Sequence, residues 1–205
     1  MKKEDFPKIT VILRGYTHSQ IRTVVKSLLG TAIKSVEITM NTPDAIEIIK
    51  SISKEFGNDI LVGAGTVTTY EEADAAIAAG ARFLLSPITF SKEIIELCKE
   101  QGVISVPGAL TPSEIMQGIR DGADIIKLFP AGIMGAAYLK DIQAPLGKLP
   151  LMVVGGVNGS NVKEFFDAGA AYAGIGSGLF KKEDIIGENL SGLKASVQKL
   201  TEQLI

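Results

Sequence analysis

Residues 69–86 read TYEEADAAIAAGARFLLS, and this stretch contains both parts of the unit from which the chain is built. Thr69 is of a type that begins helices, because its hydroxyl can accept a hydrogen bond from a backbone N–H of the first turn. Gly80 is of a type that ends helices, since glycine tolerates the left-handed conformation common there. The apolar run FLLS at 83–86 has the length and composition of a buried strand. The stretch therefore predicts a helix followed by a strand.

The same unit recurs along the chain. Further apolar runs, rich in β-branched residues and starting about 20–26 residues apart, lie at 9–13, 35–39, 60–64, 103–107, 125–129, 151–155 and 172–176. Segments between them show helical periodicity, and they open on a capping residue and close on glycine: Ser19 to Gly30, Thr42 to Gly57 and Thr111 to Gly122. The strands are apolar on both faces, as parallel strands covered by helices must be.

Eight such units predict an α/β fold, a (β/α)8 TIM barrel with eight parallel strands, formed by residues 1–205 as a single domain. The alternative is a doubly wound open sheet. That fold usually carries a glycine fingerprint after its first strand, which VILRGYTHSQ at 11–20 lacks. The closed barrel is therefore favoured.

Composition narrows the classes of partner and cofactor. The net charge is −2 and the basic residues are scattered, which argues against nucleic acid or an anionic membrane as a partner. The chain has no run of 18 apolar residues and no apolar signal region after its first residues, so we expect a cytoplasmic protein.

The chain's single cysteine, Cys98, is expected to be a half-buried helical thiol, and the single histidine is His18. They cannot form an internal disulfide or a zinc cluster, and we expect neither a metal nor another cofactor.

In a barrel the active site is built at the C-terminal ends of the strands. The predicted strand ends carry Arg14, Glu37, Thr39, Thr66, Ser86-Pro87, Pro107-Gly108, Lys127, Gly155-Gly156 and the segment 176–178. Because side chains alternate along a strand, Lys127 would point into the barrel together with Ile125 and Phe129. Thr66 would do so together with Ala64. Each strand can thus send its polar residue inward.

Lys127 interrupts the apolar run in ADIIKLFPAG at 123–132. It is a solvated strand end, a structural ion-pair partner, or an amine kept neutral for chemistry, because a buried ammonium must be paired or lose its proton. A neutral lysine can attack a carbonyl and form a Schiff base, an electron sink that replaces a metal. Arg14 would lower the pKa of the lysine further and could hold a carboxylate, and Glu37 could transfer protons.

Glycines stand at the ends of the last two predicted strands, in VVGGVNGSN at 153–161 and GIGSGLF at 174–180. In phosphate-binding barrels these two loops hold the anion through backbone N–H groups, and Ser177 would add a hydroxyl. The alternative is that these glycines only form tight turns, since the chain has 22 of them.

These motifs together resemble a known family. VEITMNTPDA at 36–45, GAGTV at 63–67, SP at 86–87, PG at 107–108, KLFPAG at 127–132, VGGVN at 154–158 and GIGSGLF at 174–180 resemble, in order and spacing, the 2-keto-3-deoxy-6-phosphogluconate (KDPG)/4-hydroxy-2-oxoglutarate (KHG) aldolases. The resemblance extends from about Ile9 to Phe180. It implies a class I aldolase, typically a homotrimer, that splits a phosphorylated 2-keto acid, KDPG, into pyruvate and glyceraldehyde 3-phosphate without a cofactor.

The resemblance also implies roles for single residues. Lys127 would be the Schiff-base lysine and Glu37 the proton acceptor, working through water. The substrate-binding residues would be Arg14, Thr39, Thr66, Pro87, Phe129, Gly155, Gly156 and Ser177. Of these, Thr66 would bind the carboxylate end of pyruvate, Pro87 and Phe129 would line the pocket, and the glycines and Ser177 would hold the phosphate.

One position departs from the pattern. Some members have an arginine two residues after the threonine of the VE-T motif, where it contacts the pyruvate carboxylate; here that position is Asn41. The carboxylate would then need Arg14, Thr66 or backbone donors. Asparagine there is similar to the branch that acts on the galactonate epimer, so 2-keto-3-deoxy-6-phosphogalactonate and 4-hydroxy-2-oxoglutarate stay alternative substrates.

Two other functions stay open. A sugar-phosphate decarboxylase or isomerase would need an array of acidic residues at the strand ends, which the sequence does not show. A non-catalytic barrel that binds a phosphorylated acid would not need a buried lysine with a glutamate partner.

Overall fold

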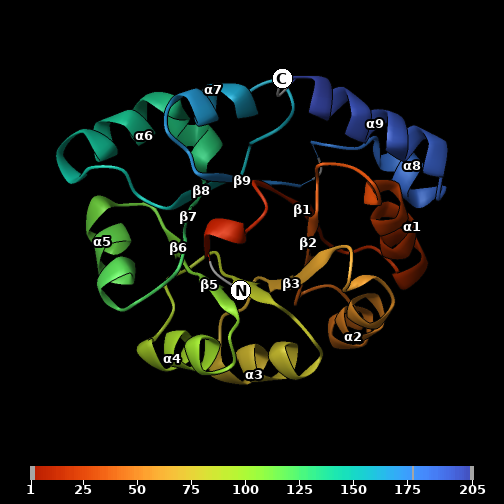
Figure 1. Ribbon diagram of the computed structural model, residues 1–205, viewed down its shortest axis with the longest axis horizontal. Helices are drawn as coiled ribbons and strands as arrows, with labels where there is room; N and C mark the ends of the chain where they lie inside the picture. The colour runs from red at the N-terminus through yellow and green to blue at the C-terminus, as the bar shows by residue number, and fades with distance from the viewer. Residues whose placement is uncertain (1–2, 177, 204–205) are drawn as a thin grey trace.

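The computed structural model describes residues 3–176 and 178–203, and it contains one sheet of nine parallel strands surrounded by helices (Figure 1). The strands are β1 (Ile9–Leu13), β2 (Ser35–Thr39), β3 (Leu61–Gly65), β4 (Phe83–Leu85), β5 (Ile104–Val106), β6 (Gly108–Ala109), β7 (Ile126–Leu128), β8 (Leu151–Val154) and β9 (Tyr172–Ile175). Their order in the sheet is β5-β4-β3-β2-β1-β9-β8-β7-β6. Strands that follow one another in the sequence are thus neighbours in the sheet, except β5 and β6, which stand at the two ends of this order. The pair β1–β9 joins the two ends of the chain.

The strands β5 and β6 are two halves of one barrel strand, separated by Pro107. Proline has no backbone N–H to donate to a ladder, so it interrupts the run predicted at 103–107. The first half pairs with β4 and the second half with β7. The N–H of Ile125 donates to the carbonyl of Ser105 at 3.2 Å, and that of Lys127 to the carbonyl of Pro107 at 2.8 Å. These bonds complete the ring, and the predicted TIM-barrel fold is confirmed.

The helices surround the ring of strands (Figure 1). They are α1 (His18–Leu28), α2 (Ala45–Phe56), α3 (Tyr70–Ala78), α4 (Lys92–Glu100), α5 (Pro112–Arg120), α6 (Ala131–Leu146), α7 (Val162–Asp167), α8 (Lys182–Ile186) and α9 (Leu190–Gln203). None of the described helices is both long enough and apolar enough to cross a membrane. In α4 the thiol of Cys98 is fully buried, not half-buried as predicted, and burial raises its pKa to about 12.

Two of the four predicted helix caps are confirmed and two are wrong. Thr69 and Thr111 cap α3 and α5. Ser19 lies inside α1, because the helix is capped two residues earlier by Thr17, which forms a capping box with Gln20. Thr42 lies before α2; its hydroxyl instead accepts the N–H of Gly15 at 3.0 Å, linking the β1–α1 loop to the β2–α2 loop.

The barrel encloses a core of its own, separate from the larger core between strands and helices. Its buried members are Phe6, Phe83, Leu85, Ile104, Val106, Ile125, Met152 and Val154. Phe6 precedes β1 and packs edge-on against Phe83, with ring centroids 5.1 Å apart. The N-terminal segment that carries it lies over the centre of the ring (Figure 1). The N-terminal end of the barrel is therefore filled by apolar side chains, and ligands must reach the interior from the opposite end.

Candidate active site

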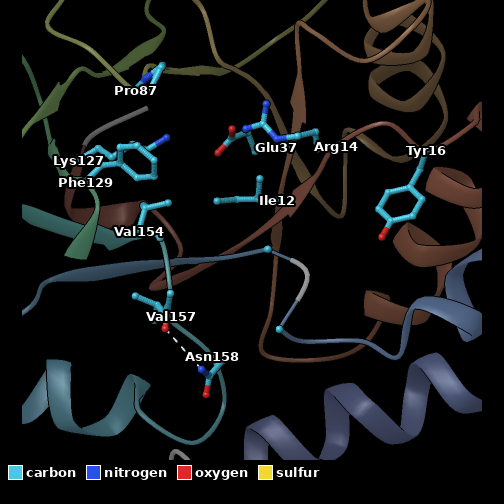
Figure 2. A pocket seen from close by; sticks show the side chains of 14 residues that line it. Ile12, Arg14, Tyr16, Glu37, Pro87, Lys127, Phe129, Val154, Val157 and Asn158 are labelled. Carbon is cyan, nitrogen blue, oxygen red and sulfur yellow. Dashed lines mark hydrogen bonds between the residues drawn. The ribbon is translucent and has the colours of Figure 1, made fainter. Parts of the chain in front are cut away.

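A cavity of about 470 Å³ lies at the C-terminal ends of the strands (Figure 2). Its described lining consists of Ile12, Arg14, Tyr16, Glu37, Pro87, Lys127, Phe129, Val154, Gly155, Gly156, Val157, Asn158, Gly176 and Gly178. The volume suits a small ligand, and the walls are largely apolar with a few convergent polar groups, as is usual for small-molecule sites. Seven of the sequence-predicted site residues line this one space: Arg14, Glu37, Pro87, Lys127, Phe129, Gly155 and Gly156.

Lys127 lies at the centre of β7 and is 4% exposed, so it is not a solvated strand end. Its neighbours Ile126 and Leu128 pack against the helices, which sends the lysine inward with Ile125. The Nζ atom lies 5.2 Å from the centroid of the Phe129 ring. Burial lowers the pKa of Lys127; Glu37 opposes this effect and Arg14 adds to it. The amine is thus closer to its neutral, nucleophilic form than an exposed lysine.

Glu37, on β2, is fully buried, and Figure 2 shows the Lys127 amine pointing toward its carboxylate. Burial raises the pKa of Glu37, although the positive charges of Lys127 and Arg14 act in the opposite direction. Neither carboxylate oxygen has a hydrogen-bond partner among the described residues. A purely structural ion pair would satisfy these oxygens, because unpaired buried polar groups are costly. The arrangement favours a carboxyl group that exchanges protons with a bound ligand.

Room for the Glu37 carboxylate comes from β3, whose inward positions include Gly63 and Gly65. A Cβ atom built on Gly65 would overlap the Glu37 carboxylate, and one built on Gly63 would overlap the Phe83 ring. The glycine at 65 is therefore required by the side chain of the neighbouring strand.

We expect Gly65→Ala to reduce the free energy of unfolding by about 1–3 kcal/mol, because the barrel interior has no space for the added methyl group. Displacement of Glu37 should also slow any reaction that this carboxylate serves. Denaturant unfolding measures the first effect, and a double-mutant cycle identifies its cause. In a Glu37→Ala background the same substitution should cost little. An equal cost in both backgrounds would contradict the assigned clash.

Thr66 and Thr39 do not belong to the described cavity lining. The parity argument for Thr66 is wrong, because Val62 and Ala64 on its face of β3 pack against the helices. Thr66 itself has φ 57°, a conformation that breaks the alternation, and its Oγ1 accepts a hydrogen bond from Arg14 at 3.2 Å. The hydroxyl of Thr39 is buried and hydrogen-bonded to that of Thr42 at 3.0 Å. Thr66 is therefore connected to the cavity through Arg14, and Thr39 is connected through Thr42 to the loop after β2.

Arg14 extends from the end of β1 and is held by two neutral acceptors. Its Nη1 donates to Oδ1 of Asn41 at 2.7 Å, and its Nη2 donates to Thr66. In Figure 2 its guanidinium lies beside Glu37 at the cavity. This places a permanent cation next to the two buried ionisable groups, where it can bind an anionic part of a ligand.

The far side of the cavity is formed by the glycine-rich strand ends. Gly155 and Gly156 have φ values of 86° and 75°, and Gly132 donates its N–H to the Gly155 carbonyl at 2.7 Å. A Cβ atom on Gly155 would come within 2.9 Å of the Phe129 ring, so packing against this ring also requires glycine at position 155. Ser177, predicted to bind phosphate, lies outside the described residues.

Sequence reasoning missed five of the lining residues: Ile12, Tyr16, Val154, Val157 and Asn158. Ile12 and Val154 could have been found, since they lie within β1 and at the end of β8 on the inward face. The other three lie in loops, where no periodicity indicates direction. Among the described residues, no group of three or more His, Cys, Asp or Glu side chains is placed to hold a metal ion.

Comparison with known proteins agrees with the family resemblance of the sequence motifs. The family described as KDPG and KHG aldolase matches residues 3–195. The chain is 33% identical over 174 residues to the 2-dehydro-3-deoxy-6-phosphogalactonate aldolase of Escherichia coli (strain K12), covering 84% of each protein. It is 31% identical over 177 residues to the 2-dehydro-3-deoxy-phosphogluconate aldolase of Treponema pallidum (strain Nichols), covering 86% of this chain and 83% of that protein.

A solved structure of KDPG aldolase from Legionella pneumophila, with pyruvate captured at low pH as a covalent carbinolamine intermediate, superposes with a TM-score of 0.85. It is 28% identical and covers 95% of this chain and 94% of that one.

Proposed function

Because the chain belongs to the KDPG and KHG aldolase family and is therefore an aldolase, a lyase, we propose that it cleaves a 6-phosphorylated 2-keto-3-deoxy sugar acid through an imine on Lys127. The observation that carries the proposal is the buried Lys127 amine, which points toward the Glu37 carboxylate in the same cavity. This carboxylate has no hydrogen-bond partner in the part of the chain that the structure describes. The covalent carbinolamine of pyruvate in the Legionella pneumophila relative supports the same chemistry.

In the proposed reaction the Lys127 amine attacks the C2 carbonyl, and the carbinolamine loses water to give a protonated imine. The C3–C4 bond then breaks, its electron pair moves toward the imine, and the C4 hydroxyl proton leaves with formation of the aldehyde. Glu37 takes up and returns these protons, directly or through water. Protonation of the resulting enamine and hydrolysis release pyruvate and regenerate the amine.

The remaining lining residues would bind the two ends of the substrate. Arg14 is the other cation in the described cavity lining and would hold the carboxylate beside the reacting carbonyl. The phosphate would lie at the glycine-rich ends of β8 and β9, where backbone N–H groups can approach an anion closely. Pro87 and Phe129 would form apolar walls that keep water from the imine. We also propose a cytoplasmic homotrimer, a proposal that rests on the sequence and the family resemblance.

KDPG is the proposed substrate, and its galactonate epimer is the second candidate. Asparagine at position 41 favours the second candidate, as does the similarity to the Escherichia coli galactonate enzyme. The two acids differ at C4, the carbon whose bond to C3 breaks. Discrimination therefore depends on how the cavity contacts the C4 hydroxyl.

Turnover of three substrates tests the proposal. We expect pyruvate release from KDPG, its galactonate epimer or both, with kcat/KM at least about tenfold above that for unphosphorylated 4-hydroxy-2-oxoglutarate, since the phosphate contributes binding energy. A coupled lactate dehydrogenase assay measures the product. The faster epimer identifies the substrate. Absence of pyruvate from all three would contradict the proposal and would favour a non-catalytic barrel.

A further inference from the structure

The contacts of Arg14 leave its charge available to the cavity. A guanidinium has five N–H donors, and the structure uses one with Asn41 at 2.7 Å and one with Thr66 at 3.2 Å. Both acceptors are neutral. Arg14 forms no salt bridge with any described residue. The side chain is thus fixed in direction, while its positive charge is not compensated by a bonded carboxylate.

Asn41 is itself held in place from both sides. The N–H of Met40 donates to the carbonyl of Gly65 at 2.7 Å, which ties the end of β2 to β3. Thr42 accepts the N–H of Gly15 at 3.0 Å, which ties the same loop to the residue after Arg14. The Asn41 side chain is exposed apart from its bond to the guanidinium, so substitutions there do not disturb the core.

The charge of Arg14 acts on the reacting pair. The ionisable residues in the described cavity lining are Arg14, Tyr16, Glu37 and Lys127. Arg14 lowers the pKa of Lys127 and also that of Glu37. A carboxylate at position 41 would pair with the guanidinium and weaken both effects. A residue at position 41 without a hydrogen-bond acceptor would leave the charge of Arg14 unchanged but would no longer hold the Arg14 side chain in place.

We propose that Asn41 is a positioning residue that orients the Arg14 guanidinium toward the carboxylate of the bound keto acid while leaving its charge uncompensated. The inference rests on the proposed function and extends it, because it assigns a role to a residue that does not line the described cavity. A neutral amide meets both requirements at once: it accepts the hydrogen bond, and it adds no negative charge.

The test measures trapping of pyruvate on Lys127 by borohydride as a function of pyruvate concentration and pH, in three variants. In Asn41→Ala the half-saturating pyruvate concentration should rise on the order of tenfold, because an unheld guanidinium binds the carboxylate less well. The pH profile of Asn41→Ala should stay that of the wild type. In Asn41→Asp the acid limb of the profile should move to higher pH. Asn58→Asp, which adds the same charge in the exposed α2–β3 loop at the other end of the barrel, should change neither quantity.

The direction of the shift follows from the amine. Only neutral Lys127 attacks pyruvate, so trapping falls as the pH drops through its pKa. Pairing of the introduced carboxylate with Arg14 would stabilise the ammonium and raise that pKa, and the fall would then begin at higher pH. An unshifted acid limb in Asn41→Asp, or unchanged pyruvate affinity in Asn41→Ala, would overturn the inference. Absence of trapping in the wild type would instead contradict the proposed function.

Discussion

Replacing Lys127 with methionine should lower kcat for pyruvate release by about 1,000-fold or more, because no other group in the described lining can form an imine. Methionine has a similar length and is apolar, so it suits the space between Ile125 and the Phe129 ring. Since a buried ammonium is costly, the variant should unfold at the same or a higher temperature than the wild type.

Lys140→Met is the matched control, since Lys140 is exposed on α6. It should leave kcat and the pyruvate adduct unchanged. Lys127→Met retaining more than about a tenth of the wild-type kcat would show that the reaction does not pass through this amine. Thermal unfolding of both variants excludes loss of structure as the cause of lost activity.

Replacing Glu37 with glutamine should lower kcat by about 100- to 10,000-fold, the range typical for removal of a general acid–base. Glutamine fits the space left by Gly65 but cannot accept a proton. Glu37 raises the pKa of Lys127, so its removal should lower that pKa. The acid limb of pyruvate trapping should then move to lower pH, opposite to the shift expected for Asn41→Asp.

Glu47→Gln, an exposed change on α2, provides the control and should affect neither kcat nor the pH profile. Unchanged kcat in Glu37→Gln would show that another group transfers the protons. A pH profile that moves to higher values would contradict the electrostatic coupling between the two buried side chains.

The barrel could be predicted from the sequence because its signals are local. Thr69 and Gly80 delimit one helix, and the apolar run at 83–86 follows at once. The break of the fifth strand at Pro107 has an equally local cause. The cap at Ser19 could not be located in this way, because Thr17 competes for the same helix through a capping box that includes Gln20.

The two central residues of the candidate site, Lys127 and Glu37, could also be predicted from the sequence. The neighbouring residues that fix their surroundings could not. Lys127 is surrounded by apolar residues in its own strand, which indicates burial without knowledge of the fold. The need for Gly65 depends on the side chain of Glu37 in the neighbouring strand, and the direction of Thr66 depends on a left-handed backbone. Contacts between strands and loop conformations of this kind require three-dimensional coordinates.

The claim that Lys127 forms an imine with a keto acid is tested most directly by borohydride trapping. The protein is incubated with pyruvate and borohydride, digested, and mapped by mass spectrometry. The account predicts a single reduced pyruvyl unit, located on Lys127 and absent from Lys127→Met. No adduct, or an adduct on a different lysine, would contradict it.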